Sequence, residues 1–276
     1  ARRGESGGGG DDLIEGGAAV TSHVGTRVHP TLHVRREHNG VDIATTEGKG
    51  KSLGKEIYAP APGRVVRNFY DAKGGGWVTT LEHYDDQGKV TGYTQYLHQQ
   101  KQSPLKEGSW VDRGQTIGHV GATGGISSGA HLHYEEWRAK PGTQPLAIDG
   151  DNKTVSAFKQ NAVRVDPEHN GLGFALTPEE KAAKEAAIKL GKSESQALQS
   201  LPGSSHAPIK AVIEGPLRPS TPVLATVTSQ PALPTWIALE VPDAKVMAAP
   251  QGAAFSGSVV AKEHGTYTLQ IGKKAF

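Results

Sequence analysis

The chain has 276 residues, of which 36% are hydrophobic, so it is long enough to bury the core of one large domain or two smaller ones. A formal net charge of +2 is too small for the clustered basic surface of a typical nucleic-acid-binding protein, which argues against that class. The chain contains no cysteine, which excludes disulfides and thiolate metal sites, so any metal must be held by His, Asp or Glu side chains.

The first part of the chain is expected to be a tail followed by a β domain. Residues 1–17 are rich in glycine and charge, which predicts a flexible Gly-rich tail. From residue 18 to 150, short apolar or alternating runs are separated by Gly, Pro, Asp and Ser clusters, as in antiparallel strands. With 36 glycines, 17 prolines and 6% aromatic residues, the chain is predicted to be mainly β rather than a helical bundle.

Residues 151–201 are predicted to form a connector with one helix, and residues 202–276 a small β-rich module of unknown role. In the segment 176–201, Thr177 is the expected N-cap, Pro178 occupies the first turn and Glu180 completes a capping box. Gly191 is expected to end or bend this helix. After residue 202, β-prone runs are punctuated by proline, which predicts the second module.

The sequence predicts no membrane span, because no run approaches the ~18 consecutive apolar residues that one requires. The chain opens on ARRGESGGGG rather than on Met and an apolar signal core. We expect either a processed product or a protein exported by a route that uses no cleaved signal.

Histidines are concentrated in the first predicted domain, which holds nine of the twelve, at positions 23, 29, 33, 38, 83, 98, 119, 131 and 133. His131 and His133 are two residues apart, so on a strand both side chains leave the same face, and one could bind a metal while the other acts as acid or base. His38 and Asp42 flank a loop that runs into a strand. Two imidazoles and one carboxylate suit tetrahedral zinc with an open fourth position. A hydrogen-bonded trio without metal, or a purely structural metal, is the alternative.

Four segments, taken in order, carry a family resemblance: VTSHVGTRVHPTLHVRREHNGVDIAT, IYAPAPGRVV, HYDDQGKVTGYTQYLH and VDRGQTIGHVGATGGISSGAHLHYE. They cover about residues 18–140 and resemble the lysostaphin-type, or LytM-like, zinc metallopeptidases that cut peptidoglycan cross-bridges. The resemblance implies a LytM-like antiparallel fold of the duplicated hybrid motif type. By motif, His38, Asp42 and His133 match the family's zinc ligands, and His98 and His131 match its two catalytic histidines.

The resemblance implies a zinc-dependent endopeptidase, with one Zn²⁺ per chain, that hydrolyses peptide stems or cross-bridges of bacterial peptidoglycan. His98 and His131 would share proton transfer, and no nucleophilic Ser or Cys is required. The expected partner is a peptidoglycan peptide and not nucleic acid, and residues 202–276 are a candidate for binding the cell wall or another protein. The expected location is periplasmic or extracellular.

Two alternatives from other functional classes stay open at this point. The first is a non-catalytic LytM-like activator of a cell-wall amidase, which would be expected to have lost metal ligands. The second is a wall-binding module in residues 202–276 that carries the peptidase as cargo.

The remaining histidines and acidic residues near the motifs are not expected to carry chemistry. His83 and His119 are expected to be satisfied strand residues, and His29 and His33 are expected at the cleft or the surface. Glu135 shares a strand face with His133, and we expect it to support the site or lie at the surface rather than to act as the general base.

Overall fold

The computed structural model describes residues 12–205, except for 29–32, 49, 86–87, 128 and 149–153, and beyond them the backbone of six strands. The chain divides into two compact units, residues 1–83 with 90–206, and residues 84–89 with 207–276. Most of the predicted tail, residues 1–11, and His29 lie outside the described residues.

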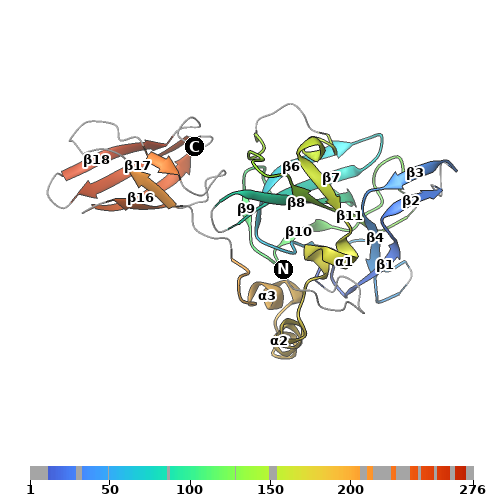
Figure 1. Ribbon diagram of the computed structural model, residues 1–276. Coiled ribbons are helices and arrows are strands. Elements are labelled where there is room, and N and C mark those ends of the chain that lie inside the picture. Colours follow the sequence, from blue (N-terminus) through green and yellow to red (C-terminus); the bar gives the residue numbers. More distant parts are fainter. Residues whose placement is uncertain are drawn as a thin grey trace. The chain divides into compact units, whose positions relative to one another are not determined.

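The first unit is built on one large antiparallel sheet (Figure 1). Its strands follow the order β1-β4-β11-β8-β7-β6-β9, and β12 also pairs with β11. Their bounds are β1 Ala18–Ser22, β4 Val41–Thr45, β6 Gly63–Asp71, β7 Gly76–Tyr84, β8 Val90–Gln99, β9 Trp110–Val111, β11 Leu132–Ala139 and β12 Ala162–Val165. The strand pairs β1–β4, β4–β11, β8–β11, β11–β12, β6–β7 and β6–β9 are all antiparallel. The prediction of a mainly antiparallel β fold is confirmed.

Two short antiparallel pairs complete the β structure of this unit. β5 (Glu56–Tyr58) pairs with β10 (Thr116–His119), and β2 (Gly25–Val28) pairs with β3 (Arg35–His38). The main core lies between these elements and consists of fully buried aliphatic and tyrosine side chains, including Val41, Ile43, Tyr96, Leu132 and Tyr134. Leu13 and Ile14, which the sequence places in the tail, belong to the same core.

The helices follow the sheet in the chain and are short. They are η1 (Lys159–Asn161), α1 (Pro167–Asn170), η2 (Leu172–Phe174), α2 (Pro178–Lys189) and α3 (Glu194–Gln199). Thr177 caps α2 in a full capping box with Glu180, as predicted. Gly191 has a φ of +89° and separates α2 from α3, which confirms that the helix ends there.

α3 packs against the β structure of the first unit. Leu198 and Leu201 form a buried cluster with Tyr58 of β5. Arg113 makes a two-pronged ion pair with Glu180, with an Nη1–Oε1 distance of 2.9 Å. The residues predicted as a connector therefore contribute buried side chains to this unit.

The second unit is described by its backbone alone. Its six strands are β13 (Lys210–Ile213), β14 (Ala225–Val227), β15 (Ile237–Val241), β16 (Ala244–Gln251), β17 (Ala254–Ala261) and β18 (Gly265–Ile271). They form one sheet in the order β14-β13-β15-β16-β17-β18, in which β13 and β15 are parallel and the other described neighbours are antiparallel. The role predicted for residues 202–276 stays a prediction.

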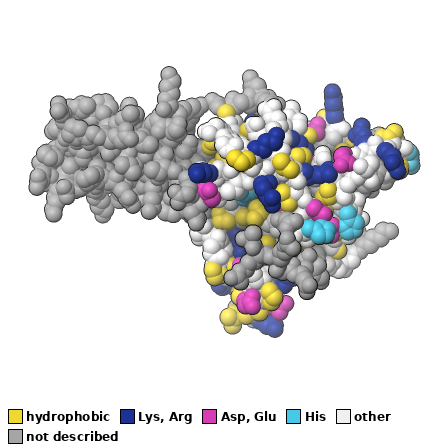
Figure 2. All heavy atoms as spheres, in the orientation of Figure 1, with side chains coloured by type: hydrophobic (Ala, Val, Ile, Leu, Met, Phe, Trp, Pro, Cys, Tyr) yellow, Lys and Arg dark blue, Asp and Glu magenta, His cyan; other side chains and the backbone are white. Residues whose placement is uncertain are grey.

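The surface of the first unit carries mixed charge. On the face shown in Figure 2, Lys and Arg side chains are dispersed among acidic and uncharged groups. In the described part of the chain, no helix has the length and apolar character needed to cross a membrane.

Candidate metal centre

Three side chains, one from β3 and two from the paired strands β4 and β11 of the main sheet, meet at one point. His38 ends β3, Asp42 lies in β4, and His133 lies in β11 directly opposite Asp42 in the strand register. The atoms His38 Nε2, Asp42 Oδ1 and His133 Nδ1 lie 3.0 Å apart in each pair, and all three residues are buried. The structure brings together the three residues predicted as metal ligands.

Gly40 allows the turn between His38 and Asp42 to lie directly on β11. A Cβ atom at this position would be 2.1 Å from the carbonyl oxygen of Tyr134, a separation that no side chain can adopt. The approach of β3 and β4 to the His133 strand therefore depends on a glycine here.

In His38 and His133, the ring nitrogen that points away from the three-residue cluster is hydrogen-bonded to another group. These bonds determine which ring nitrogen carries the hydrogen. His38 Nδ1 lies 2.7 Å from the carbonyl oxygen of His23, and His133 Nε2 lies 3.2 Å from Glu135 Oε1. Both partners are acceptors, so these nitrogens carry the hydrogens, and in the neutral imidazoles the lone pairs lie on His38 Nε2 and His133 Nδ1. Two imidazole lone pairs and a carboxylate oxygen then converge, an arrangement that repels itself unless a proton or a metal cation lies between them.

The spacing and chemistry of these donors fit a transition-metal ion. Zinc binds imidazole nitrogen and carboxylate oxygen at about 2.0–2.2 Å, and two ligands of a tetrahedral site at that distance stand about 3.3 Å apart. The observed separations of 3.0 Å are close to this value. Three protein ligands would leave one position for water or substrate, as catalytic sites do.

The charges around the site also favour a cation. Burial acts to lower the pKa of His133, but its contacts with Asp42 and Glu135 outweigh burial and raise the pKa to about 9. Burial acts against the charge of Asp42, yet His133 and His38 hold its pKa well below the usual range. Burial also opposes the charge of Glu135, whose pKa is lowered to about 2 by His133 and Lys159. Both carboxylates are therefore charged at neutral pH.

His98 and His131, the two predicted catalytic residues, lie beside the metal ligands. Their ring centroids are 4.9 Å apart, and His131 Nε2 is 3.5 Å from Asp42 Oδ1. His98 Nδ1 donates to the carbonyl oxygen of Thr123 (2.8 Å), and His131 Nδ1 donates to that of Gly129 (2.7 Å). Both imidazoles consequently present an Nε2 lone pair when neutral.

Both of these imidazoles are kept neutral by their surroundings. Burial, aided by the neighbouring His131 and His133, lowers the pKa of His98 to about 4. Burial also lowers the pKa of His131, although Asp42 acts in the opposite direction. Neutral imidazoles are the form that accepts a proton.

These side chains line a cleft of about 300 Å³. β3 supplies Arg36, the end of β6 supplies Asp71, and the glycine-rich loop 121–129 supplies Ile126. Val155 and Lys159, from the segment that follows residue 153, complete the lining. The cleft is therefore built by segments that are far apart in the sequence.

Three further histidines in the described part of the chain lie away from the cleft. His83 is buried, with Nδ1 donating to the carbonyl oxygen of Pro62 and Nε2 accepting from the Thr94 hydroxyl, both at 2.8 Å. His119 is half-buried in β10 and His33 is exposed. None of the three lines the cleft.

The sequence did not reveal the groups that orient the site histidines. The carbonyl groups of His23, Thr123 and Gly129 do this work, and any residue type can supply a backbone carbonyl, so composition and motif carry no signal for them. Lys159 lies outside the motifs. Glu135 was expected either to support the site or to lie at the surface; it is buried and contacts His133.

The chain is similar in sequence to known metallopeptidases. Residues 36–146 match the model of peptidase family M23. Over 143 residues the chain is 34% identical to a protein of Haemophilus influenzae named "Uncharacterized metalloprotease", covering 50% of this chain and 27% of that protein. Over 109 residues it is 35% identical to the peptidoglycan DD-endopeptidase ShyC of Vibrio cholerae, covering 40% of this chain and 22% of that protein.

Among solved structures, the chain is similar to that of LytU, with 26% identity and a TM-score of 0.37 over 55% of this chain and 83% of that one. The match to the family model identifies residues 36–146 as a peptidase family M23 domain, and the resemblance to LytM-like metallopeptidases is confirmed. All five predicted site residues lie within the matched residues. The chain spans about a quarter of the length of the two curated relatives.

Proposed function

We propose that this chain is a zinc-dependent endopeptidase that hydrolyses peptide bonds in the stems or cross-bridges of bacterial peptidoglycan. The observation that carries the proposal is the convergence of three acceptor atoms, from His38, Asp42 and His133, beside two imidazoles with unshared Nε2 lone pairs. The family match and the ShyC relative support the reaction class and the substrate.

His38 Nε2, Asp42 Oδ1 and His133 Nδ1 would hold the metal. When bound, zinc polarises a scissile carbonyl and lowers the pKa of a water molecule toward ~7. The protein groups that complete the reaction are His98 and His131.

His98 and His131 would move the proton between water and the leaving amine. The Nε2 atom of one neutral imidazole accepts a proton as water attacks the carbonyl carbon. Nε2–H of a protonated imidazole then donates to the oxyanion and passes the proton to the amine nitrogen as the C–N bond breaks. The Nδ1 hydrogen bonds to Thr123 and Gly129 keep both rings oriented throughout.

The proposed substrate places the active protein in the periplasm or outside the cell, where peptidoglycan lies. A non-catalytic amidase activator is disfavoured by the complete set of ligand and proton-transfer side chains. Wall binding by residues 202–276 stays a separate proposal, which binding of the full chain and of residues 1–206 to isolated cell walls would test.

Digestion of defined muropeptides tests the proposed activity. The full chain is incubated with cross-linked muropeptide dimers after chelation, with and without added zinc, and products are identified by mass spectrometry. We expect cleavage of a peptide bond only after zinc is restored. Full cleavage by the metal-free protein, or no peptide cleavage with zinc present, would contradict the proposal.

A further inference from the structure

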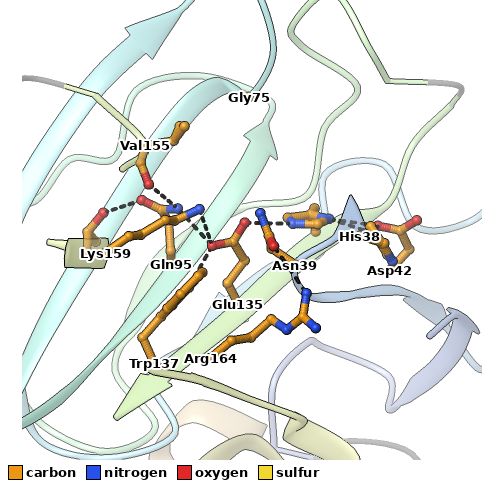
Figure 3. A network of polar contacts seen from close by, with 12 residues as sticks. His38, Asn39, Asp42, Gly75, Gln95, Glu135, Trp137, Val155, Lys159 and Arg164 are labelled. Carbon is orange, nitrogen blue, oxygen red and sulfur yellow. Dashed lines mark hydrogen bonds and ion pairs between the residues drawn. The ribbon is translucent and has the colours of Figure 1, made fainter. Parts of the chain in front are cut away.

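A buried carboxylate joins the metal centre to a cluster of hydrogen-bond donors. Glu135 lies in β11 two residues after His133 and on the same strand face, and its Oε1 contacts His133 Nε2 at 3.2 Å. Its Oε2 contacts Trp137 Nε1 at 2.8 Å, Lys159 Nζ at 2.9 Å and Gln95 Nε2 at 3.3 Å. Figure 3 shows Gln95, Trp137 and Lys159 grouped around the Glu135 side chain.

All three groups around Oε2 can only donate. An indole N–H and an ammonium group have no acceptor atom. The Gln95 amide is held in one orientation, because its oxygen accepts from the Thr80 hydroxyl (3.0 Å) and its nitrogen also donates to the carbonyl oxygen of Val155 (3.2 Å). Oε2 must therefore be an acceptor.

This arrangement determines which nitrogen of His133 carries hydrogen. With Oε2 occupied by donors, Glu135 is a carboxylate whose Oε1 is also an acceptor. His133 Nε2 must then donate, and its Nδ1 lone pair is directed toward His38 Nε2 and Asp42 Oδ1. A carboxylate in this position is known to orient the metal-binding imidazole and to strengthen it as a ligand.

Lys159 comes from a segment that lies beyond the family match, which ends at residue 146. The segment is anchored by Phe158, which is buried and stacks on Tyr93 at a centroid distance of 4.5 Å and meets Trp137 edge-on at 5.9 Å. Lys159 Nζ lies 4.8 Å from the centre of the Trp137 ring. The chain after the matched domain thus delivers a fixed cation to Glu135.

We propose that Glu135 and Lys159 are positioning residues that lock His133 in the tautomer able to bind metal, with Lys159 supplied by residues 154–161. The proposal depends on one part of the proposed function, namely that His38, Asp42 and His133 bind zinc. It extends the metal centre into a part of the chain that the family match does not include.

Glu135→Gln is the sharpest test, because the change keeps the size of the side chain. The glutamine oxygen must face the three donors, so its NH₂ group faces His133 Nε2 and forces the hydrogen onto Nδ1. We expect zinc affinity, measured by competition with a chromophoric chelator, to fall by about 10- to 100-fold. Glu135→Ala imposes no tautomer on His133, so it should lose no more zinc affinity than Glu135→Gln does. Wild-type affinity in Glu135→Gln would overturn the proposal.

Changes at Lys159 test the same idea without touching the strand that holds His133. Lys159→Met should weaken zinc binding by about 10-fold, whereas Lys159→Arg, which keeps a charged donor, should restore it. Lys140→Met is the matched control, because Lys140 is exposed and bonds to the Gln160 carbonyl oxygen of the same segment without contacting Glu135. Equal affinity in Lys159→Met and Lys140→Met would contradict the role of Lys159.

Thermal unfolding of the metal-free variants separates positioning from folding. Lys159→Met and Glu135→Gln should unfold near the wild-type temperature while their zinc affinities fall. If Glu135→Gln unfolds early, the Lys159 variants decide the question. If the wild-type chain does not bind zinc, the proposed function itself is contradicted. If the wild type binds zinc and the variants bind it equally well, only the positioning role of Glu135 and Lys159 is contradicted.

Discussion

His98 has a backbone conformation that is unusual for a residue with a side chain. Its φ is +62°, in the left-handed region, although it lies near the end of strand β8. The conformation is fixed by hydrogen bonds from its amide to the Gly75 carbonyl oxygen (2.7 Å) and from its imidazole to that of Thr123 (2.8 Å). Strain of this kind persists where the surroundings over-determine it, as they do at functional sites.

The strain at His98 predicts a difference between two variants that both remove the imidazole. His98→Gly and His98→Ala should each lose at least ~10²-fold in initial rate, because either change removes a proton-transfer group. His98→Gly should be the more stable of the two by about 1 kcal/mol, since glycine adopts positive φ without a Cβ penalty. Urea denaturation of both proteins measures this difference. A less stable glycine variant would show that the backbone is not strained.

His83 predicts how stability changes with pH away from the metal site. Burial lowers its pKa from 6.5 to about 4, so the folded protein holds the neutral form. As the pH falls, His83 binds a proton in the unfolded chain before it does so in the folded protein. The contribution of neutral His83 to the free energy of unfolding is therefore complete above pH ~6.5 and is lost between pH ~6.5 and ~4. The upper limit of this contribution to the free energy of unfolding is about 3 kcal/mol.

The measurement is the unfolding free energy of wild type and His83→Gln between pH 7 and pH 4. The wild-type protein should lose more stability over this interval than the variant, which has no titrating group at position 83. Parallel curves for the two proteins would show that His83 does not titrate differently in the folded state.

At the scale of elements, α3 is part of the folded unit around the site. Leu198 in α3 is fully buried, and a Cβ on Gly114 would lie 2.3 Å from its Cβ, so the helix lies directly on that turn. The Ser195 hydroxyl also donates to the Gly114 carbonyl oxygen (2.7 Å). This packing predicts that a cavity in α3 destabilises the whole first unit.

Leu198→Ala should lower the free energy of unfolding by about 2–5 kcal/mol. Leu190→Ala is the control, because Leu190 is 86% exposed and follows α2, and its effect should stay within about 0.5 kcal/mol. Chemical denaturation of the zinc-loaded proteins gives both values. Similar stability of the two variants would mean that α3 is a passive connector.

The elements also show which features local sequence could predict. The start of α2 follows from Thr177, Pro178 and Glu180, because capping is decided within four residues. The metal-ligand candidates could be chosen because the motifs that contain them resemble those of the LytM-like metallopeptidases. The burial of Leu13 and Ile14 and the pairing of β12 with β11 could not be predicted, because they depend on contacts between distant parts of the chain. The contact of Lys159 with Glu135 could not be predicted for the same reason.

At the scale of the whole molecule, the compact unit around the cleft is larger than the family match. The match ends at residue 146, whereas β12, Phe158, Lys159 and α3 belong to the same compact unit, which continues to residue 206. The mild net charge of +2 and the mixed charges on the face shown in Figure 2 argue against a broad electrostatic field of one sign. The domain boundaries taken from sequence stay predictions.

The central claim is that His133 binds a metal while His131, two residues away on the same strand, moves protons. Zinc content measured beside the initial rate on a cross-linked muropeptide tests it most directly, for wild type, His131→Ala and His133→Ala. Wild type should carry about one zinc per chain, and His131→Ala should keep it while its rate falls by at least ~10²-fold. His133→Ala should lose zinc as well as activity, because only two ligands remain. Release of zinc by His131→Ala as readily as by His133→Ala would contradict the assignment.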